Sequence, residues 1–196
     1  MLSQVMLALM REIDVRRALH GAQIRKLMYD DPLGLIVDEL GIEEGKFRID
    51  VAVINSRFHG FEIKSASDNL DRLPAQQNSY NKIFDHMTLV ADEKHVVQAM
   101  KIVPPWWGLV VATTVASKVQ LEEIWRSQLN PQVDSYALCQ LLWRDEALEV
   151  LKDLGLHREL RNRSRTLMWK LLATTLSASD LRGTVSAKIR LRKDWR

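Results

Sequence analysis

The chain has 196 residues, of which 46% are hydrophobic and 27% charged. This composition is that of a globular protein and excludes the disordered, collagen-like and coiled-coil classes. The single cysteine, Cys139, excludes an intrachain disulfide and a cysteine-rich zinc site, so we expect a reducing compartment. No stretch reaches the ~18 uninterrupted apolar residues of a membrane span. Residues 1–10 are apolar but lack the basic start of a signal peptide, so a soluble, cytoplasmic protein with no membrane partner is expected.

The net charge of +3 is distributed unevenly along the chain. Residues 157–196 hold 11 Lys and Arg against 3 acids, a net charge of +8, whereas residues 1–156 hold 17 bases and 22 acids, a net charge of −5. A basic end on an acidic body predicts that the C-terminal part handles a polyanion while the rest performs another task.

Two helices and a hairpin are expected at the start of the fold. Apolar residues at helical spacing predict one helix over 14–28 and a second over 35–40. Partial alternation and many β-branched residues then predict strands over 47–54 and 57–65, joined by a tight turn.

The pattern changes from mixed to helical near Asn130-Pro131. Before this point we expect a helix over 73–84, a strand over 87–92, a helix over 93–103 and strands over 109–115 and 119–125. After it only helices are expected, over 135–154 with a break near Trp143, over 163–176 and over 178–191. The sequence therefore predicts an α/β domain over 1–130, with helices flanking a mixed sheet, and a basic all-helical module over 131–196.

The helical module has three interpretations. Each of its last two helices has an apolar face to bury, and the arrangement resembles a helix-turn-helix bundle. Its basic side chains could contact DNA, dock the module on the body or on a partner protein, or be solvated charge. A cluster of Arg and Lys is first an electrostatic footprint for phosphates, so contact with DNA is our prediction.

Charged side chains interrupt both strands of the hairpin. Asp50 lies in the first strand, and Glu62 and Lys64 lie two residues apart in the second, so these two point to one face. Charges on a covered sheet face are disfavoured by several kcal/mol and persist when they are paired or bind a metal. The competing interpretation is that they are surface charges on an exposed edge hairpin.

The hairpin register decides whether these side chains meet. A three-residue turn over 55–57 gives the cross-strand pairs Ile54–Phe58, Ala52–Gly60 and Asp50–Glu62. A slip by one residue would send the two carboxylates to opposite faces of the sheet. The small pair Ala52–Gly60 also predicts room for something to lie over the sheet.

Polar residues in the neighbouring helices complete the candidate site. Gln76 and Tyr80 are four residues apart and share one helix face, and Glu39 ends a helix that we expect beside the same sheet. Carboxylates beside a lysine suit a hard cation and a phosphodiester, because Mg²⁺ prefers oxygen ligands and is held by one or two carboxylates plus substrate phosphate. Such an ion can activate a water and neutralise charge in the transition state.

These residues resemble the PD-(D/E)XK nuclease superfamily, in its RecB-like branch with a Q-x-x-x-Y motif. The matching text lies within about residues 10–125 and consists of Glu39, Arg48-Ile49-Asp50, Glu62-Ile63-Lys64 and Gln76 to Tyr80. The chain is also similar to small uncharacterised bacterial and phage members of that superfamily, in which the lysine is followed by residues matching Ser65, Asp68 and Arg72-Leu73. One departure is Ile49, which stands where the motif has proline.

The resemblance implies a restriction-endonuclease-like fold and a role for each matching residue. The implied metal ligands are Asp50, Glu62, the carbonyl of Ile63 and, as an accessory carboxylate, Glu39. The other implied catalytic residues are Lys64 as the catalytic lysine, and Gln76 and Tyr80, which position the site or the DNA backbone. The expected cofactor is Mg²⁺ or Mn²⁺.

We therefore predict a metal-dependent deoxyribonuclease that acts in DNA repair, recombination or defence. The alternative is a nuclease fold that binds DNA or a protein without cleavage, as a regulator. RNA is not excluded as a substrate, because the phosphate and metal chemistry does not distinguish the sugars. The residues expected to bind nucleic acid are Arg72, Arg161, Arg163, Arg165, Lys188, Arg190, Arg192 and Lys193.

Overall fold

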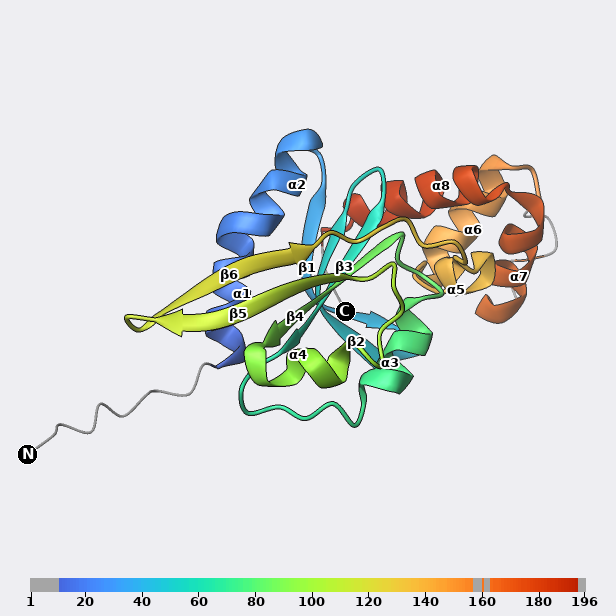
Figure 1. Ribbon diagram of the computed structural model, residues 1–196. Helices are drawn as coiled ribbons and strands as arrows, with labels where there is room; N and C mark the ends of the chain where they lie inside the picture. The colour runs from blue at the N-terminus through green and yellow to red at the C-terminus, as the bar shows by residue number, and fades with distance from the viewer. Residues whose placement is uncertain (1–10, 157–159, 161–162, 194–196) are drawn as a thin grey trace, which may run out of the picture.

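A six-stranded sheet forms the centre of the protein, in a computed structural model that describes residues 11–156, 160 and 163–193 (Figure 1). Its strands are β1 (Leu35–Ile42), β2 (Phe47–Ile54), β3 (Phe58–Lys64), β4 (His86–Asp92), β5 (Gly108–Val115) and β6 (Lys118–Trp125), in that spatial order. The pairs β3–β4 and β4–β5 are parallel and the other three pairs are antiparallel. The predicted mixed sheet is therefore confirmed.

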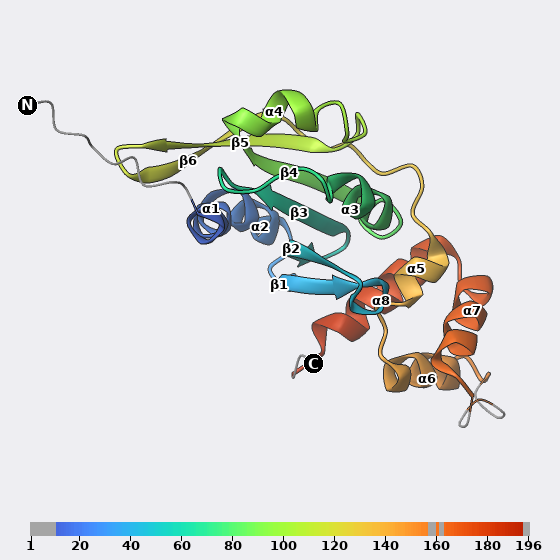
Figure 2. The ribbon, with the colours of Figure 1, turned by 90° about the horizontal axis from the view of Figure 1, so that it is seen from below.

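Helices cover both faces of this sheet (Figure 2). The helices that flank the sheet are α1 (Glu12–Leu19), α2 (Arg25–Asp30), α3 (Leu73–Tyr80) and α4 (Glu93–Ala99), and a π-helical turn, His20–Ile24, joins α1 to α2. Val15 and Leu19 pack with Val51 of β2, whereas Leu73 packs with Ala52. Because neighbouring residues of a strand point to opposite faces, α1 and α2 lie on one face and α3 on the other.

The segment predicted as a second helix is instead the edge strand β1. It runs antiparallel to β2, with Leu35 opposite Ile54 and Ile42 opposite Phe47. A short apolar run such as Leu35-Ile36-Val37 is compatible with either a strand or a helix. Here the backbone pairing with β2 stabilises the strand. The helix prediction over 35–40 is therefore wrong, and Glu39 lies in a strand.

The C-terminal part is helical, as predicted, and consists of α5 (Ser135–Cys139), α6 (Arg144–Asp153), α7 (Arg165–Thr175) and α8 (Ala178–Arg190), with the predicted break at Trp143. Its buried side chains belong to the same apolar cluster as Ala52 and Ile54 of β2 and Phe58 of β3. The helices therefore pack against the sheet, and the division at residue 130 and the helix-turn-helix likeness stay predictions.

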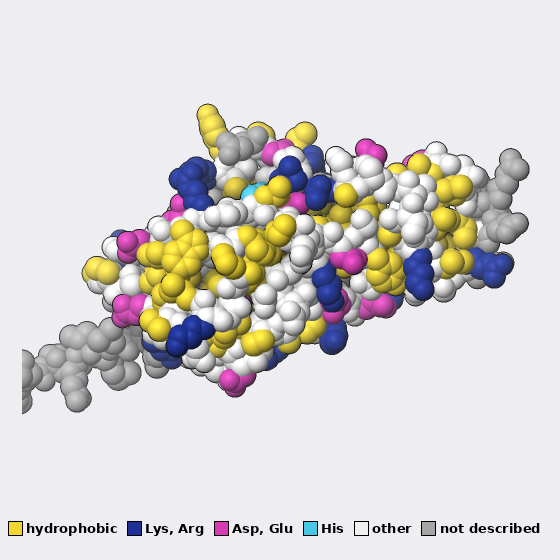
Figure 3. Space-filling model, turned by 45° about the vertical axis from the view of Figure 1, so that its right-hand side comes forward, with side chains coloured by type: hydrophobic (Ala, Val, Ile, Leu, Met, Phe, Trp, Pro, Cys, Tyr) yellow, Lys and Arg dark blue, Asp and Glu magenta, His cyan; other side chains and the backbone are white. Residues whose placement is uncertain are grey.

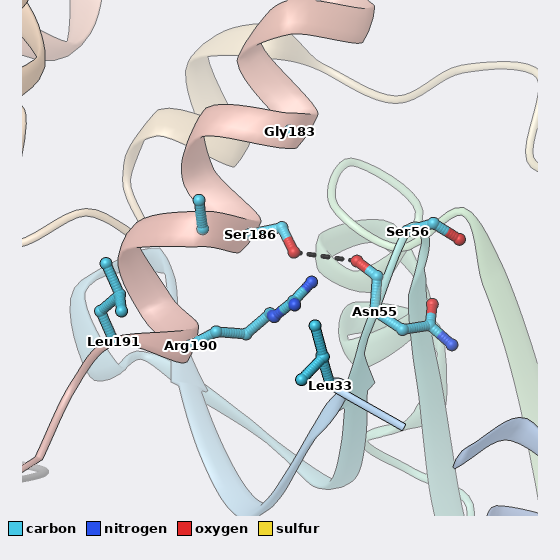
Figure 4. A pocket seen from close by; sticks show the side chains of 8 residues that line it. Leu33, Asn55, Ser56, Gly183, Ser186, Arg190 and Leu191 are labelled. Atoms are coloured by element: carbon cyan, nitrogen blue, oxygen red, sulfur yellow. Dashed lines mark hydrogen bonds between the residues drawn. The ribbon is translucent and has the colours of Figure 1, made fainter. Parts of the chain in front are cut away.

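Helix α8 docks on the turn between β2 and β3. The Ser186 hydroxyl donates to the Asn55 carbonyl at 2.8 Å (Figure 4), and Arg182 forms an ion pair with the buried Asp85 at 2.8 Å. A cavity of about 510 Å³ lies beside this contact, and the side chain of Arg190 extends toward it. Within the described residues no helix is both long and apolar enough to cross a bilayer.

Candidate active site

The register of the β2–β3 hairpin is the predicted one. Ile54 pairs with Phe58 and Ala52 with Gly60, and the ladder ends at Val51–Phe61, one step before Asp50 and Glu62. Beyond this point a side chain replaces the backbone acceptor: the Asp50 Oδ2 accepts a hydrogen bond from the Ile63 N–H at 2.6 Å. The two carboxylates therefore lie side by side where the strands separate.

The space predicted over Ala52 and Gly60 is filled by the protein itself. A Cβ at Gly60 would lie 2.4 Å from the sulfur of Met87 and 3.1 Å from the ring of Phe84. Since both neighbours belong to the core on that face, the small pair serves close packing there, and the predicted room over it is taken up by these core side chains.

Glu62 is 1% exposed and is held by three side chains. Its Oε1 accepts from Lys64 Nζ at 2.7 Å and from Gln76 Nε2 at 2.6 Å, and its Oε2 lies 2.9 Å from the Tyr80 hydroxyl. Burial raises the pKa of Glu62, and the Lys64 ammonium is the foremost group opposing that rise. The predicted stripe of Gln76 and Tyr80 on α3 therefore fixes the Glu62–Lys64 pair in the sheet.

Lys64 is held in one orientation by two acceptors. Its ammonium donates to Glu62 and, at 3.1 Å, to Gln76 Oε1, and the side chain is 10% exposed. An ammonium has three donors, so the third is available to a water or a phosphate oxygen in front of the pair.

Asp50 holds its proton to a higher pH than an exposed aspartate does. Burial, followed by the charge of Glu62, raises the pKa of Asp50 to about 8, and the hydrogen bond from Ile63 opposes this shift. A cation beside Asp50 would favour its charged form. The protonation of Asp50 is therefore sensitive to any charge placed beside it.

Asp50 should make stability decrease as the pH rises. Without a divalent cation, the folded protein keeps a proton on Asp50 that the unfolded chain, with a carboxyl pKa of about 3.9, has released. The free energy of unfolding should therefore fall between about pH 5 and pH 8, and this can be measured by urea unfolding in EDTA. Replacement Asp50→Asn should reduce that slope, whereas Asp71→Asn, an exposed carboxylate that does not line the pocket, should leave it in place. A slope equal in Asp50→Asn and wild type would contradict the assignment.

A second group of carboxylates meets Asp50 from α1 and β1. Ligand oxygens of Glu12, Glu39 and Asp50 lie within 4.8 Å of one another. Glu39 faces Asp50 in the interrupted β1–β2 ladder and has a left-handed backbone, with φ of 57°. Carboxylate oxygens at this spacing suit a hard divalent cation, so the donor set fits Mg²⁺ or Mn²⁺.

Arg16 of α1 lies among these carboxylates. Its guanidinium is hydrogen-bonded to Glu12 and Glu39 and lies 4.0 Å from Asp50 Oδ1. Neither Glu12 nor Arg16 was predicted as a site residue, because only the fold brings α1 against β1 and β2. Their i, i+4 spacing was visible in the sequence, but such pairs occur on many solvent-exposed helices.

A polar pocket of about 380 Å³ opens over these groups. The predicted site residues that line it are Glu39, Asp50, Glu62, Ile63, Lys64, Arg72 and Gln76, and the lining also includes Glu12, Lys46 and Arg48. Tyr80 bonds Glu62 and is fully buried. The structure therefore places the residues predicted for metal binding and catalysis, and Arg72 from the predicted nucleic-acid set, in or directly behind one pocket. The carboxylates of Glu39 and Asp50 gather with that of Glu12, whereas the carboxylate of Glu62, predicted as a ligand, is bound by Lys64, Gln76 and Tyr80 and is not part of that group.

Among the described residues, the others predicted to bind nucleic acid do not line this pocket, and three of them are paired with acids. Arg165 bonds Glu44, Lys188 lies 2.9 Å from Glu149, and Arg192 lies 2.6 Å from Glu146. Arg161 lies outside the described residues. On the face drawn in Figure 3, Lys and Arg side chains of the helical part stand apart from one another. The residues Arg163, Arg190 and Lys193 form no ion pair with any described residue.

Comparison with known proteins places this chain in a phage family. Residues 6–194 match the family described as bacteriophage P4 protein cII. Protein cII of Enterobacteria phage P4 is 27% identical over 187 residues, which cover 95% of this chain and 69% of that protein. A solved structure of a protein of unknown function from Silicibacter pomeroyi aligns with a TM-score of 0.41 at 16% identity, over 77% of this chain and 90% of that one. The chain belongs to the bacteriophage P4 protein cII family.

Proposed function

We propose that this chain is a divalent-cation-dependent nuclease that hydrolyses DNA phosphodiester bonds at the pocket over Asp50, Glu62 and Lys64. The observation that carries the proposal is the burial of a lysine and a glutamate side by side, 10% and 1% exposed, next to Asp50. A buried ion pair costs desolvation energy and is weak evidence of stability, so a catalytic role accounts for its presence. The resemblance to PD-(D/E)XK nucleases points to the same residues.

Each residue of the pocket has a task in this proposal. A Mg²⁺ or Mn²⁺ ion held by Asp50, Glu39 and the Ile63 carbonyl would supply charge neutralisation and a more acidic water. Lys64 offers its remaining N–H as a hydrogen bond to the attacking water or to a phosphate oxygen, which orients that group and stabilises negative charge, and Glu62 and Gln76 hold the ammonium in place for that contact. Tyr80 fixes the far oxygen of Glu62. The proposal places the protein in the cytoplasm, where DNA is accessible.

The proposal is tested by incubating the protein with supercoiled, nicked, linear and single-stranded DNA, with Mn²⁺, with Mg²⁺ and with EDTA. Cleavage of at least one form that depends on the ion supports it. A pure, folded wild-type protein that is inert on every form with both ions contradicts it. RNA is included as a further substrate, because the proposed phosphate and metal chemistry does not distinguish the sugars.

A second candidate is a DNA- or protein-binding regulator that uses this fold without cleavage. The observation in its favour is Arg16, whose guanidinium already neutralises Glu12 and Glu39 from within the chain. The family membership agrees better with this candidate than with cleavage, since the matched family and its relative are named as phage protein cII and not as a nuclease. The two candidates differ in one property: only the nuclease requires a divalent cation at Asp50.

A further inference from the structure

Three exposed cations surround the acidic pocket. Lys46 lies directly before β2, Arg48 is the second residue of β2, Arg72 lies directly before α3, and all three line the pocket. Arg48 has the only ion-pair contact among them within the described residues, a loose 3.6 Å approach to Glu39, and its side chain is 65% exposed. Lys46 lies 5.4 Å from the centre of the Phe47 ring.

Three other cations of this region form ion pairs with acids. Lys64 pairs with Glu62, Arg16 bonds Glu12 and Glu39, and Lys82 lies 2.9 Å from Glu43. A cation that already has an acidic partner has less to gain from a phosphate, because it must first give up that partner. Lys46, Arg48 and Arg72 are therefore the cations of this region with the most charge to offer a polyanion, and we call them the rim.

The same comparison separates the rim from the helical part. There, Arg165, Lys188 and Arg192 are neutralised by glutamates, and Arg182 is fixed on buried Asp85. The excess of +8 in residues 157–196 is thus partly used to attach the helices to the acidic body. This arrangement corresponds to the docking interpretation of the basic C-terminal part.

We propose that the rim of Lys46, Arg48 and Arg72 holds the backbone phosphates of a nucleic acid strand across the pocket. We also propose that the rim contributes more to binding than the exposed Lys and Arg side chains of the C-terminal helices. The centre of the pocket is acidic, so the strand is held by contacts flanking the carboxylates of Asp50 and Glu39. Lys and Arg that meet phosphates release condensed counterions, which makes their contribution measurable through salt. The inference shares the nucleic-acid substrate with the proposed nuclease but does not require cleavage.

The test compares two triple variants of the full chain that lose the same charge. One carries Lys46→Ala, Arg48→Ala and Arg72→Ala. The matched control carries Arg163→Ala, Lys170→Ala and Lys193→Ala, which are exposed positions of the C-terminal part. Binding of fluorescent single-stranded and duplex DNA is measured by anisotropy in EDTA at several salt concentrations, and thermal melting checks that each variant is folded.

The rim variant should lower the slope of log K against log salt by about 2.7 on duplex DNA and about 2.1 on single strands, as three lost phosphate contacts require. The control should change the slope by less than about 1. A control that lowers the slope as much as the rim variant does, an unchanged slope in the rim variant, or a wild type that binds neither DNA at low salt would overturn the inference. If wild type binds DNA through the rim but never cleaves it, only the proposed nuclease activity is contradicted. If wild type cleaves DNA but the rim variant keeps the wild-type slope, only the role of the rim is contradicted.

Discussion

Replacement Asp50→Asn should reduce ion-dependent DNA cleavage by about 10²- to 10⁴-fold, the range typical of losing a group that acts on the transition state. The asparagine oxygen can still accept the hydrogen bond from Ile63, and removing an acid whose pKa is raised by burial leaves the fold at least as stable. The rate loss would therefore report chemistry and not unfolding. The measurement is the initial rate of cleavage in Mn²⁺ at equal concentrations of folded protein.

The matched control is Asp38→Asn. Asp38 is a carboxylate of the neighbouring strand whose side chain bonds His20, and it does not line the pocket. Its rate should stay within about twofold of wild type, since exposed substitutions away from a site have small effects. Replacement Lys64→Met tests the same pocket independently and should reduce the rate of DNA cleavage by a similar factor. If both Asp50→Asn and Lys64→Met cut DNA as wild type does, the cleavage does not come from this pocket.

Replacement Asp85→Ala should destabilise the protein by about 3–5 kcal/mol, as expected when one partner of a buried ion pair is removed. Asp85 is 1% exposed, accepts the Phe58 N–H at 2.9 Å and pairs with Arg182 of α8. Without the carboxylate, both the amide at the start of β3 and the guanidinium lose their partner. Urea unfolding followed by circular dichroism measures the change.

An exposed pair of the same helix serves as the control. Glu149 pairs with Lys188, and the Glu149 side chain is 65% exposed. Replacement Glu149→Ala should cost less than about 1 kcal/mol, because solvent screens exposed pairs. Equal losses at Asp85 and Glu149 would show that α8 is not anchored through the buried pair.

The hairpin register was predictable because turn length and strand alternation leave few choices. A three-residue turn fixed Ile54 opposite Phe58, and period-2 alternation then placed Asp50 and Glu62 on one face. The i, i+4 spacing of Gln76 and Tyr80 was equally informative, since a helix has only one way to present both. Local rules of this kind are sufficient to predict contacts between residues that are close in the sequence.

The features that the sequence could not predict depend on contacts between distant segments. Leu35–Ile42 becomes a strand because β2 offers an edge to pair with, and this pairing is absent from the local pattern. Arg16 reaches Glu39 only after α1 packs on the sheet. In the same way, counting charges shows that residues 157–196 are basic but not that Arg165 and Arg192 lie against glutamates.

Titration of the folded wild type and of Asp50→Asn with Mn²⁺, followed by calorimetry and by the paramagnetic resonance of the free ion, tests most directly whether the pocket is a divalent-cation site. Wild type should take up the ion, in competition with Arg16 for Glu39 and Glu12, and Asp50→Asn should bind it at least about tenfold more weakly. If wild type takes up no Mn²⁺ at millimolar concentrations, or if Asp50→Asn binds it equally well, the pocket is not a divalent-cation site and the non-cleaving regulator is the better description.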